Sequence, residues 1–341
     1  EALLRWNDPQ NGLVYPESFL SLVEHDSSIM IDLGHWVLET ALSQLETWLL
    51  AGLDISLSIN VSSHELQHEN FVEVLQKLLT KHHHIKPNLI EIEILETLAF
   101  ENFELTSDIL NQCSSMGISI AIDDFGTGYA SLNYLKKLPK NTLKIDKSFV
   151  IDLLTSSQNM SIVEASIGLA NAFNSHVVAE GVESEKIGEV LLQLGCEIAQ
   201  GYAISEAMPA QEVEDWIQSW KGFSSWEKVK PLNPQNRAIL HTEVEHKNWI
   251  NAIEAFIQNR TSELPNLNSS QCYLGNWLIN ESSKAQREHP EFNELKEIHD
   301  ELHHYAEKLL RSNKKDKQAG VDKIVRLHKK ILVKLNAIME G

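Results

Sequence analysis

The sequence predicts two fold classes in one chain: an α/β barrel of the (β/α)8 type, followed by an all-α four-helix bundle. In the first two-thirds, short β-rich segments alternate with amphipathic helical segments. In the last third, apolar residues recur at helical spacing and strand signals are absent. The acidic excess also lies almost entirely in the first 222 residues, while the remainder is nearly balanced. Such different electrostatics predict two domains.

Composition excludes several classes of protein. The chain has 341 residues, with 29 Lys and Arg against 48 Asp and Glu, and a formal charge of −19. A surface of this charge repels polyanions, so we expect no general nucleic-acid binding. The three cysteines lie far apart, which is not a disulfide framework and indicates a cytoplasmic protein. We expect no membrane contact within this segment, because no apolar run is long enough to span a bilayer; the parent protein could be anchored upstream of Glu1.

Strands and helices are expected in strict alternation. Strands are predicted at residues 55–60, 89–94, 118–122, 142–145, 176–179 and 197–199, and helices at 31–50, 101–116, 159–174, 185–194 and 211–220. This alternation favours a parallel sheet with helices outside it. The number of repeats, and the absence of a Gly-x-Gly-x-x-Gly motif, favour a barrel over a Rossmann sheet.

Polar side chains stand where six consecutive predicted strands end. In α/β barrels the catalytic groups lie at the carboxyl ends of the strands. One acidic residue at a strand end is more often a solvated residue, so the ordered set carries the prediction. Its members are Asn60, Glu93, Asp123, Asp124, Lys144, Glu180 and Gln200.

The chemistry of this set indicates hard metal ions. Oxygen ligands without thiolate or imidazole suit Mg²⁺ or Mn²⁺, and the candidates are Glu1, Asn60, Glu93, Asp123, Asp124 and Glu180. Clustered carboxylates repel one another unless cations intervene. Two ions roughly 3.5–4 Å apart would clamp an in-line displacement at phosphorus, and Lys144 could orient the water or stabilise negative charge.

Residues 1–222 resemble the EAL family of cyclic di-GMP phosphodiesterases. The matching motifs, in order, are Glu1-Ala2-Leu3-Leu4-Arg5-Trp6, Ser58–Ser62, Asp123–Tyr129, Leu143–Phe149, Ala179–Glu183 and Gln200-Gly201-Tyr202. The resemblance implies a TIM-like barrel whose first strand is antiparallel, and hydrolysis of cyclic di-GMP to pGpG with two Mg²⁺ or Mn²⁺ ions. EAL barrels commonly pair, so it also implies a homodimer.

The resemblance also implies individual roles. Glu1, Asn60, Glu93 and Asp123 would hold the first ion, and Asp123, Asp124 and Glu180 would serve the second. Lys144 and Gln200 would position water, and Leu3 and Arg5 would contact the dinucleotide. Glu96 would anchor the 123–132 loop, with Glu183 as a nearby support.

Two departures from the family keep an alternative open. Leu95 occupies a position where the family has Thr, and the strand that normally precedes the Glu-Ala-Leu motif is absent from this sequence. The alternative is a catalytically inactive receptor for cyclic di-GMP, whose C-terminal bundle is a sensor or a dimerisation element.

The last third predicts a second metal site. After a proline-containing linker at 223–237, helices are expected at 238–258, 270–282, 291–312 and 321–339. His299 and His303 are four residues apart and so share a helix face. A lone buried His such as His246 is more often a hydrogen-bonded core residue. Together with this pair and Cys272, however, His246 would complete a closed tetrahedral zinc site.

This segment resembles the chemoreceptor zinc-binding (CZB) family over roughly residues 240–310. The matching elements are Glu245–Trp249, Cys272–Trp277 and His299–His303. The resemblance implies one zinc ion on His246, Cys272, His299 and His303, and a module that reports zinc or thiol-directed oxidants to an attached signalling domain. The sign of any effect on activity stays open. His328 falls on the inner face of the last helix and is interpreted as a core or spare residue.

Overall fold

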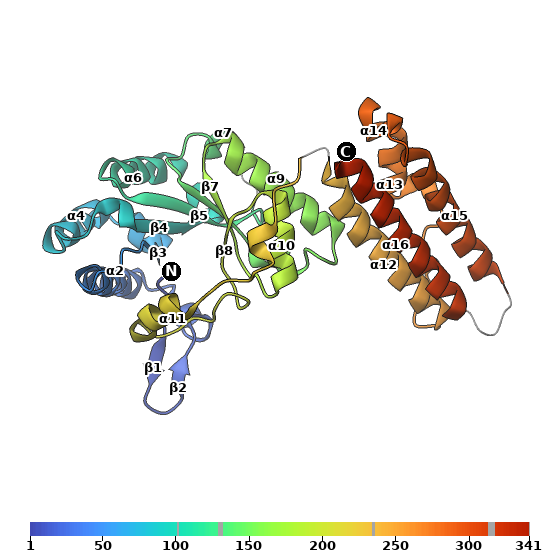
Figure 1. Cartoon of the computed structure of the whole chain (residues 1–341). Helices are drawn as coiled ribbons and strands as arrows, with labels where there is room; N and C mark the ends of the chain where they lie inside the picture. The colour runs from blue at the N-terminus through green and yellow to red at the C-terminus, as the bar shows by residue number, and fades with distance from the viewer. Residues whose placement is uncertain (101, 129–131, 234–235, 313–317, 341) are drawn as a thin grey trace. The chain divides into compact units, whose positions relative to one another are not determined.

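The computed structural model describes residues 1–100, 102–128, 132–233, 236–312 and 318–340. The chain forms two compact units (Figure 1). The first comprises residues 1–151, 162–191 and 196–228, and the second comprises 152–161, 192–195 and 229–341.

A six-stranded parallel sheet organises the first unit, with its strands in sequential order. The strands are β3 (Leu57–Asn60), β4 (Ile90–Leu95), β5 (Ser119–Phe125), β6 (Thr142–Ile145), β7 (His176–Ala179) and β8 (Ile198–Ala199). All six predicted strands are therefore confirmed. Ala2 forms an isolated parallel bridge with Ile59, so the segment that begins at Glu1 lies beside β3. This topology confirms the predicted TIM-like α/β class.

The predicted helices lie outside this sheet (Figure 1). They are α2 (Ser27–Leu50), α6 (Phe103–Ser115), α9 (Ser157–Ala172), α10 (Glu185–Leu194) and α11 (Val213–Ser219). Helix α2 begins four residues before the predicted start, because the carboxylate of Asp26 accepts hydrogen bonds from the backbone of Ser28 and Ile29. The predicted start of α6 at Glu101 lies outside the described residues.

Several short elements were not predicted. They include the hairpin of β1 (Trp6–Asp8) and β2 (Gly12–Val14) and the short helices α1 (Leu20–Val23), α3 (Ser63–Leu66), α5 (Glu96–Phe100), α7 (Leu132–Leu135) and α8 (Lys147–Ile151). The longer helix α4 (Phe71–Lys81) lies between β3 and β4 in the chain. Strands of three residues are too short for alternation to be recognised.

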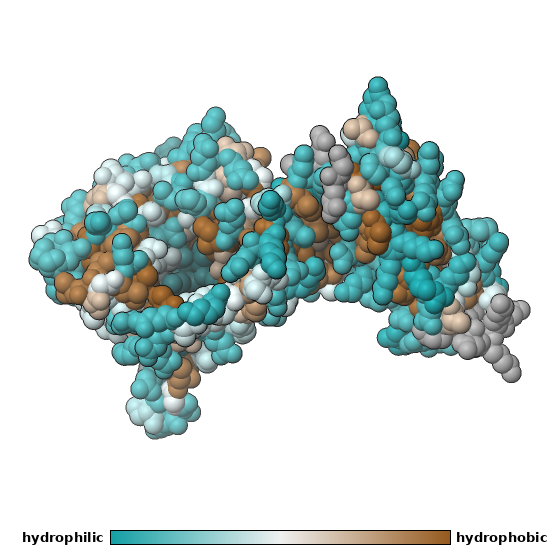
Figure 2. All heavy atoms as spheres, in the orientation of Figure 1, coloured by the Kyte–Doolittle hydropathy of each residue, from teal (hydrophilic) through white to brown (hydrophobic). Residues whose placement is uncertain are grey.

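The two faces of the strands have different roles. In β4, Ile90, Ile92 and Ile94 are fully buried and alternate with Glu91 and Glu93, because successive side chains of a strand point to opposite faces. The apolar face packs under helices such as α2, whose inner side is also buried. On its outer side α2 exposes Ile29, Trp36 and Leu50, and Figure 2 shows hydrophobic residues gathered over this helix.

The second unit is all-α. Its long helices are α12 (Ala238–Ile257), α15 (Phe292–Arg311) and α16 (Gln318–Glu340). The predicted regular helix at 270–282 is wrong in detail. This segment consists of a 3₁₀ turn, η6 (Ser269–Gln271), the short helix α13 (Tyr273–Asn276) and a π-helical turn, η7 (Trp277–Glu281), and is followed by α14 (Lys284–Glu288). Within the part of the chain that the structure describes, the bundle therefore has three long helices and one segmented side.

No helix among the described residues is both long and apolar enough to cross a membrane.

Candidate active site and metal centre

Lys144 lies at the centre of the predicted active-site residues. It belongs to β6 and is only 2% exposed. Its Nζ lies 2.8 Å from a carboxylate oxygen of Glu93 and 2.8 Å from one of Glu180. The carboxylates of Glu1 and Asp123 are 3.4 Å and 3.6 Å away. Four acidic side chains from separate segments thus surround one ammonium group.

Two amide side chains complete the cluster. Asn60 Nδ2 donates to Glu1 at 2.7 Å. Gln200 Nε2 donates to Glu180 at 2.7 Å and to Glu1 at 3.1 Å. Both amides therefore fix the orientation of carboxylates, and the structure brings together the polar residues predicted at the strand ends.

Asp123 follows the alternation of β5, whereas its neighbour Asp124 departs from regular strand geometry. The pairing of β5 with β6 shifts register between Ile122 and Phe125, and Asp124 has a φ of 53°, in the left-handed region. Oxygens of Asp123, Asp124 and Glu180 all lie within 4.8 Å of one another. Such a group of hard oxygen donors fits a divalent cation.

The protonation of these groups reflects their burial. Burial, together with the neighbouring carboxylate of Glu1, raises the pKa of Glu93 to about 7, and burial likewise raises the pKa of Glu180 to about 7. Burial and the adjacent Asp123 raise the pKa of Asp124 to about 6. Burial opposes a charge on Lys144, but the surrounding carboxylates outweigh it and raise its pKa. Without further cations the cluster thus retains protons that a divalent ion would displace.

Two residues that sequence reasoning missed support the cluster. Glu91 lies two residues before Glu93 on the same strand face, and its carboxylate accepts hydrogen bonds from Ser58 at 3.1 Å and Thr142 at 2.6 Å. The carboxylate of Asp146 interacts with Asp124 and contributes to its raised pKa. The alternation Ile-Glu-Ile-Glu was the sequence signal for Glu91, since it places Glu91 and Glu93 on one face.

The remaining predicted residues differ in their burial and contacts. Glu96 is buried and accepts a hydrogen bond from Gly126 N–H at 2.7 Å, at the start of the loop that it was predicted to anchor; residues 129–131 of that loop lie outside the described residues. Leu95 and Leu3 are about half exposed. The guanidinium of Arg5 lies 4.7 Å from the centroid of the Tyr15 ring. Glu183 is exposed, and its supporting role stays a prediction.

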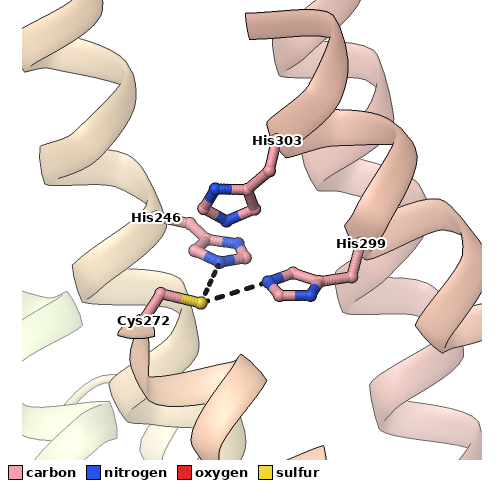
Figure 3. Close-up of side chains that lie close together, drawn as sticks. All are labelled: His246, Cys272, His299 and His303. Atoms are coloured by element: carbon pink, nitrogen blue, oxygen red, sulfur yellow. Dashed lines mark hydrogen bonds between the residues drawn. The ribbon is translucent and has the colours of Figure 1, made fainter. Parts of the chain in front are cut away.

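The second unit brings together the four predicted zinc ligands, as Figure 3 shows. His246 comes from α12, Cys272 precedes α13, and His299 and His303 lie on α15. Cys272 Sγ is 3.1 Å from His299 Nε2 and 3.8 Å from His246 Nε2. His303 Nδ1 lies 3.2 Å from the carbonyl oxygen of Leu267, and its buried Nε2 has no hydrogen-bond partner.

These four residues suit a tetrahedral zinc ion. Burial lowers the pKa of His299 to about 4 and also lowers those of His246 and His303, so the imidazoles are neutral, as metal ligands must be. Burial raises the pKa of Cys272 to about 11, so binding of a metal would have to release the thiol proton. The unpartnered Nε2 of His303 is a buried lone pair that a metal would satisfy.

Comparison with known proteins identifies both units. Residues 1–207 match the family model of the EAL domain. The chain belongs to the EAL domain family. Residues 246–310 match the model of the chemoreceptor zinc-binding domain.

Curated relatives align with about two thirds of the chain. The bifunctional diguanylate cyclase/cyclic di-GMP phosphodiesterase MucR of Pseudomonas aeruginosa is 40% identical over 214 residues, which is 62% of this chain and 31% of MucR. The cyclic di-GMP phosphodiesterase PdeR of Escherichia coli is 34% identical over 220 residues, or 64% of this chain and 33% of PdeR. The chain thus spans about a third of the length of these relatives.

Solved structures agree with this fold. The MucR phosphodiesterase in complex with c-di-GMP is 40% identical to the EAL domain with a TM-score of 0.60, covering 62% of this chain and 85% of that one. The EAL enzyme Bd1971, in a form with cAMP and cyclic di-GMP bound, is 38% identical with a TM-score of 0.60, covering 63% of this chain and 59% of its own.

Proposed function

We propose that the EAL domain hydrolyses cyclic di-GMP to pGpG in the cytoplasm, with two Mg²⁺ or Mn²⁺ ions, and that the C-terminal bundle binds one zinc ion and regulates this activity. The observation that carries the first part is the convergence of Glu1, Glu93, Asp123 and Glu180 on Lys144. Relatives at 34–40% identity are named as phosphodiesterases of this substrate, which supports the choice of substrate.

The reaction is a water-dependent cleavage of one phosphodiester bond. The oxygen of water forms a new bond to phosphorus, the bond from phosphorus to the 3′ oxygen breaks, and the leaving oxygen takes up a proton. One linear dinucleotide with a 5′ phosphate and a 3′ hydroxyl results. When bound, the divalent ions would lower the pKa of the attacking water and neutralise negative charge at phosphorus.

Individual residues of the chain would bind the ions, stabilise charge and orient the reacting groups. Glu1, Asn60, Glu93 and Asp123 would hold one ion, and Asp123, Asp124 and Glu180 the other. Lys144 is fixed among carboxylates and can stabilise the charge that develops at the phosphoryl oxygens. Gln200 holds Glu180 and Glu1 in one orientation through its amide hydrogens. These oriented groups keep the water and the phosphorus in line.

Replacement of one carboxylate tests the assignment. Glu180→Gln keeps the shape of the side chain but removes its charge, so we expect pGpG formation to fall by at least about 100-fold. The exposed Glu24 on the same unit provides the matched control, Glu24→Gln, which should retain full turnover. Unchanged turnover in Glu180→Gln with Mn²⁺ present would show that the assigned site is wrong.

A second candidate function rests on Leu95. This side chain lies at the end of β4, two residues after Glu93, and is 47% exposed, so the site lacks the hydroxyl that the family usually has there. A receptor that binds cyclic di-GMP without cleaving it would show saturable binding and no pGpG with either Mg²⁺ or Mn²⁺.

The zinc site would be held by His246, Cys272, His299 and His303. Metal analysis of the purified chain should find one zinc per chain, and Cys272→Ala should lower that content. Turnover measured before and after chelation of zinc then tests regulation: a change of either sign supports it, and equal rates would leave the bundle as a dimerisation element.

We further propose a homodimer, for which sedimentation analysis is the direct measurement.

A further inference from the structure

A fifth histidine lies beside the four predicted zinc ligands. His328 belongs to α16 and is 8% exposed. The centroid of its ring lies 5.4 Å from that of His246, and the two ring planes meet at 64°. His328 is outside the group of side chains whose ligand atoms lie within 4.8 Å of one another, so its position does not fit a fifth ligand of the same ion.

The nitrogens of His246 have distinct surroundings. Its Nε2 faces Cys272 Sγ at 3.8 Å, which makes Nε2 the metal-binding nitrogen. The opposite nitrogen, Nδ1, is buried and has no hydrogen-bond partner. When Nε2 binds a metal, Nδ1 must carry the proton, because a neutral imidazole has one N–H and one lone pair.

His328 offers the complementary group. Its own Nδ1 is also buried without a hydrogen-bond partner. A buried polar nitrogen without a hydrogen-bond partner destabilises the folded chain, so a contact between these two nitrogens would be favourable. The two ring centroids are 5.4 Å apart, a separation at which one ring nitrogen can donate a hydrogen bond to the other when the two face each other.

The zinc ligand His303 shows how such a pairing works. Its Nδ1 lies 3.2 Å from the carbonyl oxygen of Leu267, so it can donate to a backbone acceptor while Nε2 stays free for the metal. Metal-bound histidines generally donate their second N–H to an acceptor, which fixes the tautomer and the ring orientation. In its present orientation the Nδ1 of His246 meets no such acceptor among the described residues, and the ring of His328 lies beside it.

We propose that His328 is a positioning residue of the zinc centre, whose Nδ1 accepts a hydrogen bond from the Nδ1–H of His246 when His246 binds zinc through Nε2. This inference rests on the proposed zinc site and extends it to α16. Zinc binding would then order a hydrogen bond between α12 and the last helix of the bundle.

Two nearly isosteric variants test this proposal in the full chain. In His328→Asn, the amide oxygen can occupy the place of Nδ1 and accept the same hydrogen bond, whereas His328→Leu fills similar space without an acceptor. Zinc affinity is measured by competition with a chelating dye, and helix content by circular dichroism. We expect His328→Leu to weaken zinc binding about 10–100-fold and His328→Asn to stay within a few-fold of the original chain.

A spectroscopic measurement separates this role from packing. In the zinc-loaded chain, nitrogen-detected NMR of the imidazoles should show His246 protonated at Nδ1 and protected from exchange, and His328→Leu should lose that protection even at saturating zinc. Equal zinc affinity in His328→Leu, or equal loss in the Asn and Leu variants, would overturn the inference while leaving the zinc site intact. Absence of stoichiometric zinc in the original chain would overturn the zinc site itself.

Discussion

The carboxyl group of Glu65 lies in the interior of the first unit, away from the proposed chemistry. Glu65 is 2% exposed, and its Oε1 has no hydrogen-bond partner. A Cβ at Gly34 would lie 2.2 Å from this carboxyl group, so glycine at that position of α2 makes room for it. Burial raises the pKa of Glu65 to about 8.

This pKa predicts how stability depends on pH. The folded chain holds the Glu65 proton up to about pH 8, while the unfolded chain releases it near pH 4.5. The contribution of Glu65 to stability is therefore fully present below about pH 4.5 and is lost as pH rises to about 8. Glu65→Gln should stabilise the chain by on the order of 1–3 kcal/mol at pH 8 and have little effect at pH 5.

Denaturant unfolding at the two pH values is the measurement. Glu104→Gln, at an exposed position of α6, is the matched control and should change stability little at either pH. A Glu65→Gln variant with the same stability increment at pH 5 and pH 8 would contradict the assignment of a buried, neutral carboxyl group.

Replacement of Lys144 should affect both stability and turnover. Lys144→Met removes the cation among four carboxylates, so we expect the metal-free chain to lose about 3 kcal/mol or more. Added Mn²⁺ should restore part of this loss, because divalent ions would replace the missing charge, but turnover should stay at least about 100-fold low. Thermal unfolding with and without Mn²⁺ measures the first effect; a variant as stable as the original chain without metal would count against a charged cluster.

The clustering of the candidate site residues could be predicted from sequence for a physical reason. Parallel strands bring their carboxyl ends to one edge of a sheet, so residues such as Asn60, Glu93 and Lys144 could be grouped before any coordinates were known. Asp146 could not, because its contact with Asp124 depends on the irregular pairing of β5 and the left-handed backbone of Asp124. Periodicity holds no information about such local backbone changes.

Among the helices and strands, the segment from Cys272 to Glu281 differs most from its prediction, which was a regular helix. Cys272 caps α13, since its Sγ accepts a hydrogen bond from the backbone of Gly275 at 3.3 Å. The helix then widens into a π turn. Apolar spacing predicts that a helix forms here, but not that it starts at the cysteine or changes its hydrogen-bond register. The position of the thiol therefore depends on this local geometry.

Gly275 gives a direct prediction for this segment. A Cβ at Gly275 would lie 1.7 Å from the backbone oxygen of Ser269, so Gly275→Ala must displace η6 or α13. We expect it to lower zinc affinity by at least about 10-fold. The control is Gly168→Ala in α9, where a Cβ meets nothing within 4 Å and helix propensity should raise stability by roughly 0.5–1 kcal/mol. Retention of full zinc affinity in Gly275→Ala would show that Cys272 does not need this cap.

For the whole molecule, zinc should stabilise the second unit. Binding to the folded chain alone raises its stability in proportion to the logarithm of zinc concentration over the dissociation constant. It also satisfies the buried Nε2 of His303. We expect chelation to lower the unfolding temperature of the bundle, as followed by calorimetry, and zinc to restore it. Chelation without any shift would contradict a structural zinc ion.

The division into an α/β unit and a helical unit could also be predicted from sequence, because strand-helix alternation stops where the acidic excess ends. The three long helices of the bundle follow from apolar stripes on α12, α15 and α16. The grouping of His299 and His303 on one helix face could be predicted from their spacing, whereas the place of His328 beside His246 required the packing of α16.

In the proposed mechanism, the carboxylates around Lys144 seat divalent ions that direct water at the phosphodiester of cyclic di-GMP. Its most direct test is incubation of the chain with cyclic di-GMP and Mn²⁺ in ¹⁸O-labelled water, with the product analysed by mass spectrometry. We predict pGpG that carries one ¹⁸O atom in its 5′ phosphate and that forms only when divalent ions are present. Cyclic di-GMP that stays bound and uncleaved, or cleavage that proceeds equally in a metal chelator, would contradict the claim.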